Sequence, residues 1–173
     1  LWEPQYTMIA SSEIYQPFLL TNDLFPGHTC CVVAGLDSYM EANPEVTVAF
    51  LAAYKQAVDY INAALADKSS AEYQRLIEIC ITYTTGLTEE QIVSALDNIV
   101  YKFSDDNITG SLDDLVTDIA DLESNLANMG AITTDIADLG FSSSTEFAEM
   151  LVDDSYLTQA VNGEATNVGN VSL

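Results

Sequence analysis

The sequence predicts a helix-dominated α/β fold with a few short strands, and three observations lead to this prediction. A continuous apolar run, Cys30–Ala34, follows a Pro-Gly turn, which is typical of a buried strand. From Asp37 onward, apolar residues recur at spacings of three and four, the period of an amphipathic helix. The 173 residues, 49% of them hydrophobic, suffice for one ordinary core. We therefore expect a single domain over residues 1–161 and a tail or linker over residues 162–173.

Residues 1–34 are predicted to be irregular, with a second short strand at Phe18–Thr21. The first long helix is expected from Asn43, a good N-cap, through Pro44 at the first helical position, to about Leu65. Its buried face is predicted from apolar residues at helical spacing: Val46, Phe50, Ala53, Ala57, Ile61 and Ala64.

Capping patterns predict two further helices. Ser69 and Glu72 form a capping box for a helix that carries Cys80 on its inner face and that Gly86 ends. Thr88 and Gln91 open a shorter helix that carries Ile92, Leu96 and Ile99.

The last third of the sequence predicts a helix from Ser111 to Met129, ended by Gly130, and two shorter helices. Ser143 and Glu146 cap the first of these, and Asp154 opens a last turn through Val161. The hexapeptide Thr-Asp-Ile-Ala-Asp-Leu occurs at 117–122 and 134–139, which we interpret as a coincidence of biased composition. The 111–129 helix carries a short heptad seam, expected to pack on this chain's own core, or else on a partner: Leu112, Leu115, Ile119, Leu122, Leu126 and Met129.

The charge of the chain excludes one class of partner. Twenty-seven acidic residues against four basic ones give a formal net charge of −23. Nucleic-acid binding needs clustered Lys and Arg, and the same charge argues against docking on an anionic membrane surface. The acids are scattered, which indicates a solvated surface or one adapted to high salt. Because salt screens self-repulsion, we expect thermal stability to rise between low salt and about 1 M NaCl. No apolar run is long enough to span a membrane.

The inventory of catalytic and metal-binding residues is nearly empty, so neither an enzyme nor a cofactor is predicted. His28 lies two residues from Cys30, but no third orienting group accompanies them, and the cysteines lack the Cys-x-x-Cys spacing of a zinc site. On a strand Cys30 and Cys31 would point to opposite faces, and Cys80 is expected to be packed rather than disulfide-bonded. Residues 104–110 are acidic but have the wrong register for a calcium loop, which leaves at most a weak adventitious site.

Two sequons, at Asn107 and Asn170, are candidate glycosylation sites and would suit an exported protein.

Three short motifs carry a family resemblance. The chain opens with Trp2-Glu3-Pro4, continues with Pro26-Gly27-His28-Thr29-Cys30-Cys31-Val32, and reaches Asn43-Pro44-Glu45 at the long helix. This layout resembles the later part of NMT1/THI5-like (SsuA/TauA/NrtA-type) solute-binding proteins of ABC importers. In that family a Trp-Glu-Pro segment lies near the hinge between two lobes, and a His-Pro-Cys-Cys-Val segment leads a strand back into the first lobe. In this chain Thr29 stands where the family's His-Pro-Cys-Cys-Val segment has its proline.

The resemblance implies a partial type II periplasmic-binding-protein-like lobe that begins in mid-fold. It implies an extracytoplasmic component that binds a small anion or heterocycle, of the nitrate, sulfonate or taurine class, with an ABC permease or a missing N-terminal lobe as partner. Trp2, Glu3 and Tyr6 match the hinge-side motif by position and are the implied ligand-binding residues. Some members of the wider family are pyrimidine-forming enzymes that use several histidines, but this chain has one, so that activity is not carried over.

An alternative of a different class is a structural or assembly module of an extracellular filament or surface layer. Each predicted helix carries an apolar stripe, and two or three short strands would cover only part of them. We therefore expect that the chain is not a stable free monomer and that either the missing lobe or copies of the chain itself cover the stripes. Any self-association should be specific and should strengthen with salt. The Leu112–Met129 seam and strand addition along Cys30–Ala34 are the candidate contacts.

Overall fold

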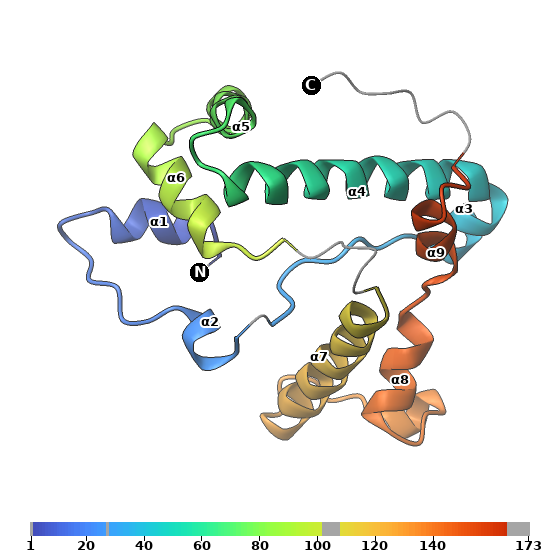
Figure 1. Cartoon of the computed structure of the whole chain (residues 1–173). Coiled ribbons are helices and arrows are strands. Elements are labelled where there is room, and N and C mark those ends of the chain that lie inside the picture. The colour runs from blue at the N-terminus through green and yellow to red at the C-terminus, as the bar shows by residue number, and fades with distance from the viewer. Residues whose placement is uncertain (1, 27, 102–107, 166–173) are drawn as a thin grey trace. The chain divides into compact units, whose positions relative to one another are not determined.

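The computed structural model describes residues 2–26, 28–101 and 108–165, with side chains from residue 115 onward in the last range. Over these residues all regular structure is helical (Figure 1). The helices are α1 (Gln5–Ala10), α2 (Thr21–Leu24), α3 (Asp37–Ala42), α4 (Pro44–Ala66), α5 (Ala71–Tyr83), α6 (Glu89–Asn98), α7 (Ile108–Asn128), the 3₁₀ helix η2 (Ile136–Leu139), α8 (Ser144–Leu151) and α9 (Ser155–Val161).

The predicted α/β fold with a periplasmic-binding-protein-like lobe is wrong, since the described residues form no sheet. Cys30–Ala34 has no regular structure, and Thr21 of the second predicted strand begins α2. A strand is stable only when its backbone groups pair with a neighbour. Near the first run, the Thr29 backbone N–H instead donates to Asp118 Oδ2 of α7 at 2.6 Å. The apolar run therefore predicted a buried strand, but residues 30–34 form an exposed segment without regular structure.

The chain divides into two compact units, which we call the α5/α6 unit and the α7/α8 unit. The α5/α6 unit comprises Leu1–Gly27 and Ala57–Lys102, and the α7/α8 unit comprises His28–Gln56 and Phe103–Leu173. Helix α4 contributes its first part to the α7/α8 unit and its last part to the α5/α6 unit.

The α5/α6 unit has a core of large side chains. Helices α5 and α6 pack side by side, and α1 packs on α6 (Figure 1). The end of α4 completes the core through Ala64, and Tyr60 of α4 donates a hydrogen bond to the Glu72 carbonyl at 3.0 Å. The other buried members come from α5 and α6: Tyr73, Leu76, Ile77, Ile92 and Leu96.

The α7/α8 unit has a smaller core, in which the buried residues Val48 and Ala52 of α4 pack with Ala160 of α9. Helices α7 and α8 pack against each other separately (Figure 1). This core corrects the predicted inner face of α4. Val46 and Phe50 are each 54% exposed, whereas Val48 and Ala52, which point elsewhere on the helix, are buried. Periodicity placed Ile61 and Ala64 correctly at the α5/α6 core, but in the first part of the helix it identified the wrong side as buried.

The predicted capping patterns match several helix boundaries. The Thr88–Gln91 capping box is present, Ser143 Oγ accepts from the Glu146 N–H, and Asp154 precedes α9. Gly130 lies in the left-handed region at φ 70° and ends α7, with the Ala131 N–H bonded to the Leu126 carbonyl, as in a Schellman motif.

The N-cap of α5 is Ser70 rather than Ser69. The Asp67 carboxylate accepts from both the backbone and the hydroxyl of Ser69, so that Ser70 is left to cap the helix through the Tyr73 N–H. These bonds from Ser69 hold the pKa of Asp67 below its usual value.

None of the described helices has the length and apolarity that a membrane crossing requires.

Candidate functional site

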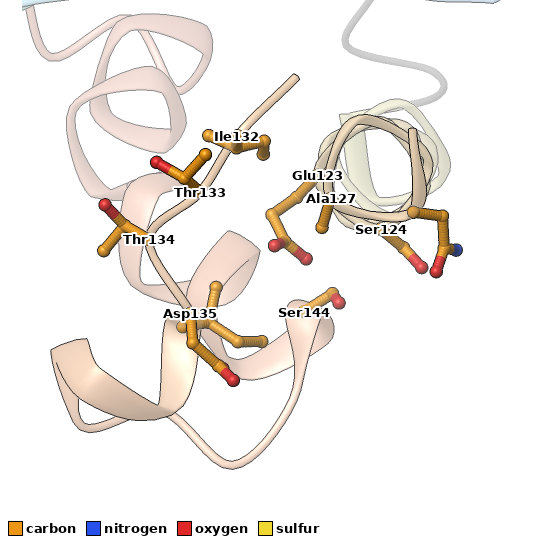
Figure 2. Close-up of a pocket in the computed structure, with 10 residues that line it drawn as sticks. Glu123, Ser124, Ala127, Ile132, Thr133, Thr134, Asp135 and Ser144 are labelled. Atoms are coloured by element: carbon orange, nitrogen blue, oxygen red, sulfur yellow. The ribbon is translucent and has the colours of Figure 1, made fainter. Parts of the chain in front are cut away.

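An open pocket of about 350 Å³ lies in the α7/α8 unit, between the end of α7, the segment that precedes η2, and the start of α8. Figure 2 shows the Glu123 side chain reaching from α7 toward residues 132–135, with Ser144 on the α8 side. Its volume is at the small end of the range for ligand sites. The lining residues are Glu123, Ser124, Ala127, Asn128, Ile132, Thr133, Thr134, Asp135, Ile136 and Ser144.

The lining combines two carboxylates with hydroxyl and amide groups and contains no Lys, Arg or His. Asp135 is held in place because its Oδ1 accepts from the Ala137 N–H at 2.9 Å as the N-cap of η2. Ala127, Ile132 and Ile136 supply apolar surface. Such a lining accepts hydrogen bonds and attracts positive charge, and it would repel a small anion.

Local sequence explains why the pocket walls have this shape. Gly130 ends α7, and Gly140, at φ 94°, ends η2. Both backbone conformations favour glycine because a side chain would be strained there. At the Gly130 turn the Ala131 and Ile132 N–H groups donate to the Leu126 carbonyl, which brings the chain back beside α7. Gly140 makes the second turn, between η2 and α8.

The start of α8 is fixed by two hydrogen bonds from Ser142 to the carboxylate of Glu146. The Ser142 N–H donates to Glu146 Oε2 at 2.7 Å, and the Ser142 hydroxyl donates to the same oxygen. These bonds hold the pKa of Glu146 below its usual value. Phe141 and Phe147 pack edge to face with ring centroids 5.4 Å apart, which anchors the turn before Ser144.

The three residues implied as ligand contacts, Trp2, Glu3 and Tyr6, lie at the start of the α5/α6 unit and not at this pocket. Trp2 is 67% exposed. Glu3 serves the fold, since Oε2 accepts from the Thr7 N–H at 3.2 Å and Oε1 accepts from Asn98 Nδ2 of α6 at 2.6 Å. Tyr6 is half-buried on α1. The Glu3 carboxylate, which precedes α1, therefore bonds both to the first turns of α1 and to the end of α6.

Thr7 has the buried polar atom that stands out in the described residues, because its hydroxyl has no hydrogen-bond partner and the residue is 3% exposed. Both carboxylate oxygens of the nearby Glu3 already accept hydrogen bonds, one from the Thr7 N–H and one from Asn98 Nδ2. A buried hydroxyl without a partner costs free energy, and we assign it no ligand.

The three cysteines are free thiols. Burial raises the pKa of Cys80, which packs beside the α5/α6 core as the sequence predicted. Cys30 and Cys31 are both exposed, and their Sγ atoms lie 3.8 Å apart rather than on opposite faces, since no strand forms there. A hydrogen bond with the Cys31 thiol, followed by partial burial, raises the pKa of Cys30.

Several predicted sites lie wholly or partly outside the described residues. The sequons at Asn107 and Asn170 do, as does most of the acidic 104–110 segment. Within the part of the chain that the structure describes, no group of three or more His, Cys, Asp or Glu residues is arranged to hold a metal ion.

Comparison of the chain with protein-family models, with curated proteins and with solved structures found no match.

The pocket residues were not singled out from the sequence. Asp135 belongs to the second copy of the repeated hexapeptide, and Glu123 follows the first copy directly. The paired glycines at 130 and 140 are the signal that could have located this turn region.

Proposed function

We propose that the chain is a non-catalytic, extracytoplasmic solute-binding component of an ABC importer and that the α7/α8 pocket contacts the solute. The observation that carries this proposal is an open pocket of ligand size, lined by hydrogen-bonding groups of which Asp135 is held by the Ala137 N–H. The motifs Trp2-Glu3-Pro4 and His28-Thr29-Cys30-Cys31 support it through their resemblance to such proteins. It does not rest on the fold, which differs from the one that the resemblance implied.

The lining of the pocket favours one of the solute classes that the resemblance implies. Nitrate and sulfonates need positive charge or several N–H donors, but the lining offers two carboxylates and no cationic side chain. A nitrogen heterocycle that donates hydrogen bonds, or is protonated, matches Glu123 and Asp135. The heterocycle branch of the implied class is therefore the one that we retain.

A thermal-shift panel tests this proposal. Nitrogen heterocycles, small amines, nitrate and taurine are each added in excess, and a ligand that binds only the folded state must raise its stability, by about 2.7 kcal/mol at 100 times the Kd. We expect a shift with at least one heterocycle and none with nitrate or taurine. No shift with any heterocycle, or a shift with the anions alone, would contradict the proposal.

Two matched variants locate the binding. Glu123→Gln removes a pocket charge, whereas Glu149→Gln removes an exposed charge from α8 that does not line the pocket. Glu123→Gln should weaken the binding of the active heterocycle about tenfold, the effect of losing about 1.4 kcal/mol. If the two variants bound the heterocycle with equal affinity, the binding site would not be this pocket.

A second candidate function, self-assembly as a structural module, is favoured by one specific observation. Val46, Phe50 and Tyr54 form an exposed stripe along α4, and the Phe50 and Tyr54 rings stack with centroids 6.2 Å apart. Residues 44–57 contain Glu45 and Lys55 as their only charged side chains. In a chain of net charge −23, a second copy can approach with little repulsion at such a stretch. The occupant that we propose for the stripe is therefore a second copy.

Light scattering coupled to size exclusion tests this assembly at low and at moderate salt. We expect a species larger than 18.8 kDa that grows with salt, because salt screens the repulsion. Phe50→Glu should restore the monomer, whereas Phe18→Glu, the same change at another exposed Phe, should not. A monomer at both salt concentrations, or loss of assembly in both variants, would contradict this candidate.

A further inference from the structure

Cys30 and Cys31 form a pair of neighbouring thiols on the surface of the α7/α8 unit. They lie in the segment without regular structure that precedes α3, and both side chains are exposed. The Cys31 thiol donates to Cys30 Sγ across 3.8 Å, so both sulfurs lie on the same side of the chain. A strand would have separated them, and their proximity follows from the absence of a strand at these residues.

The spacing of the two sulfurs matches that of two thiolates bound to one atom. Bonds from zinc to cysteine sulfur are about 2.3 Å, and two such bonds at a tetrahedral angle place the sulfurs about 3.8 Å apart. The observed Sγ–Sγ distance is the same, 3.8 Å. A thiophilic atom could therefore bind both sulfurs with little rearrangement.

A disulfide between these two residues is disfavoured, which keeps the thiols available. Neighbouring Cα atoms are about 3.8 Å apart across a trans peptide. Ordinary disulfides join Cα atoms that are about 4.4–6.8 Å apart, and departures from this range store strain that makes the bond easier to reduce. Sulfur-to-metal bonding relieves this constraint, because the bridging atom lets the sulfurs stay apart.

We propose that Cys30 and Cys31 are a two-sulfur site that binds one thiophilic metal ion or one trivalent arsenic centre. With an aryl arsenoxide, both thiols lose their protons, two As–S bonds form, and the arsenoxide oxygen leaves as water, without any change of oxidation state. The site is a chelate and not a closed cage, in keeping with the lack of a third ligand residue grouped with it in the described ranges. It is separate from the α7/α8 pocket, which contains no cysteine.

Phenylarsine oxide with intact-mass readout tests this site on the full chain. One phenylarsine group should be retained per chain in excess glutathione, a monothiol, and be released by a dithiol such as dithiothreitol. A count of free thiols should fall from three to one on binding. Failure to retain the group in glutathione would overturn the proposal.

Single serine variants identify the sulfurs. Cys30→Ser and Cys31→Ser should each lose the retained group, because one thiol cannot form the chelate. Cys80→Ser, the matched control, should keep it, since Cys80 lies half-buried beside another core. Circular dichroism checks that each variant remains helical. Retention in either Cys30→Ser or Cys31→Ser, or its loss in Cys80→Ser, would contradict the two-sulfur site.

Discussion

The two units of this chain bury different kinds of side chain. The α5/α6 unit encloses Tyr73, Leu76, Ile77, Ile92 and Leu96. In the α7/α8 unit the buried cluster between α4 and α9 consists of Val48, Ala52 and Ala160, and Ala120 and Ala148 are buried on α7 and α8. Both units contain amphipathic helices with good caps, so local sequence quality does not separate them. The difference teaches that a helix-forming sequence does not by itself produce a core of large side chains. Burial stabilises a helix only where a neighbour presents a matching apolar face.

Short connections explain why the α5/α6 unit obtained the larger core. Residues 67–70 join α4 to α5, and residues 84–88 join α5 to α6, so the apolar faces of consecutive helices meet. Lys68 in the first connection also pairs with Asp97 of α6 at 2.6 Å, and this bond raises the pKa of the Lys68 amine. In the α7/α8 unit, α4 must meet α9, which lies about a hundred residues later in the chain.

Truncation of the larger core should give the largest loss of stability. Leu76 is 4% exposed, and Leu76→Ala should lower the free energy of unfolding of the α5/α6 unit by about 2–5 kcal/mol, through lost burial and the cavity left behind. Alkylation of Cys80 during a urea titration measures this, because Cys80 packs on the same core. If the urea midpoint of Cys80 alkylation were the same in Leu76→Ala as in the unchanged chain, Leu76 would not stabilise this core, and the comparison of the two cores would fail.

Truncation of the smaller core should cost less. Val48→Ala removes two methyl carbons from the α7/α8 unit, which corresponds to about 1.6 kcal/mol. Hydrogen exchange of the α4 and α9 amides measures the loss, and the Cys80 midpoint should not move. A loss as large as that of Leu76→Ala would show that the two cores are equally important.

The loss of a cap should be smaller again. Thr88 Oγ accepts from the Gln91 N–H, and Thr88→Ala should cost about 1 kcal/mol because it leaves that donor without a side-chain partner. Ser94→Ala, in the exposed middle of α6, is the matched control and should cost nothing. Urea denaturation of both variants decides the matter, and equal effects would rule out the cap as the cause.

The smallest effect is expected at the exposed stripe of α4. At a concentration where the chain is monomeric, Phe50→Ala should change the free energy of unfolding by no more than about 0.5 kcal/mol, since the ring is half exposed. The same variant should weaken self-association. A large loss of stability in the monomer would mean that Phe50 belongs to a core, as the sequence periodicity predicted.

The sequence was most informative where a short segment decides its own structure. The Thr88–Gln91 box, Ser143 and Gly130 fixed helix ends, because the bonds involved span a few residues. The buried face was predicted correctly at the end of α4, where Ile61 and Ala64 meet the neighbouring α5/α6 core. It was predicted wrongly in the first part of α4, where burial depends on α9 far along the chain. The strand at Cys30–Ala34 failed for a related reason: an apolar run predicts burial only if a partner strand exists.

The repeated hexapeptide makes the same point at the candidate site. Thr-Asp-Ile-Ala-Asp-Leu is α-helical at 117–122, inside α7, but at 134–139 it supplies the N-cap and the 3₁₀ helix η2. The second copy lies between Gly130 and Gly140, which interrupt the helix on both sides. Asp135 therefore faces a pocket because of its flanking glycines, which a motif search on the hexapeptide itself would not reveal.

Hydrogen–deuterium exchange read by mass spectrometry on the full chain tests the contrast between the two units most directly. Amides in α5 and α6 should exchange slowest, because their opening exposes the large core, whereas amides in the first part of α4 and in α9 should exchange markedly faster. Equal protection of the two units, or stronger protection of α9 than of α5, would contradict the account.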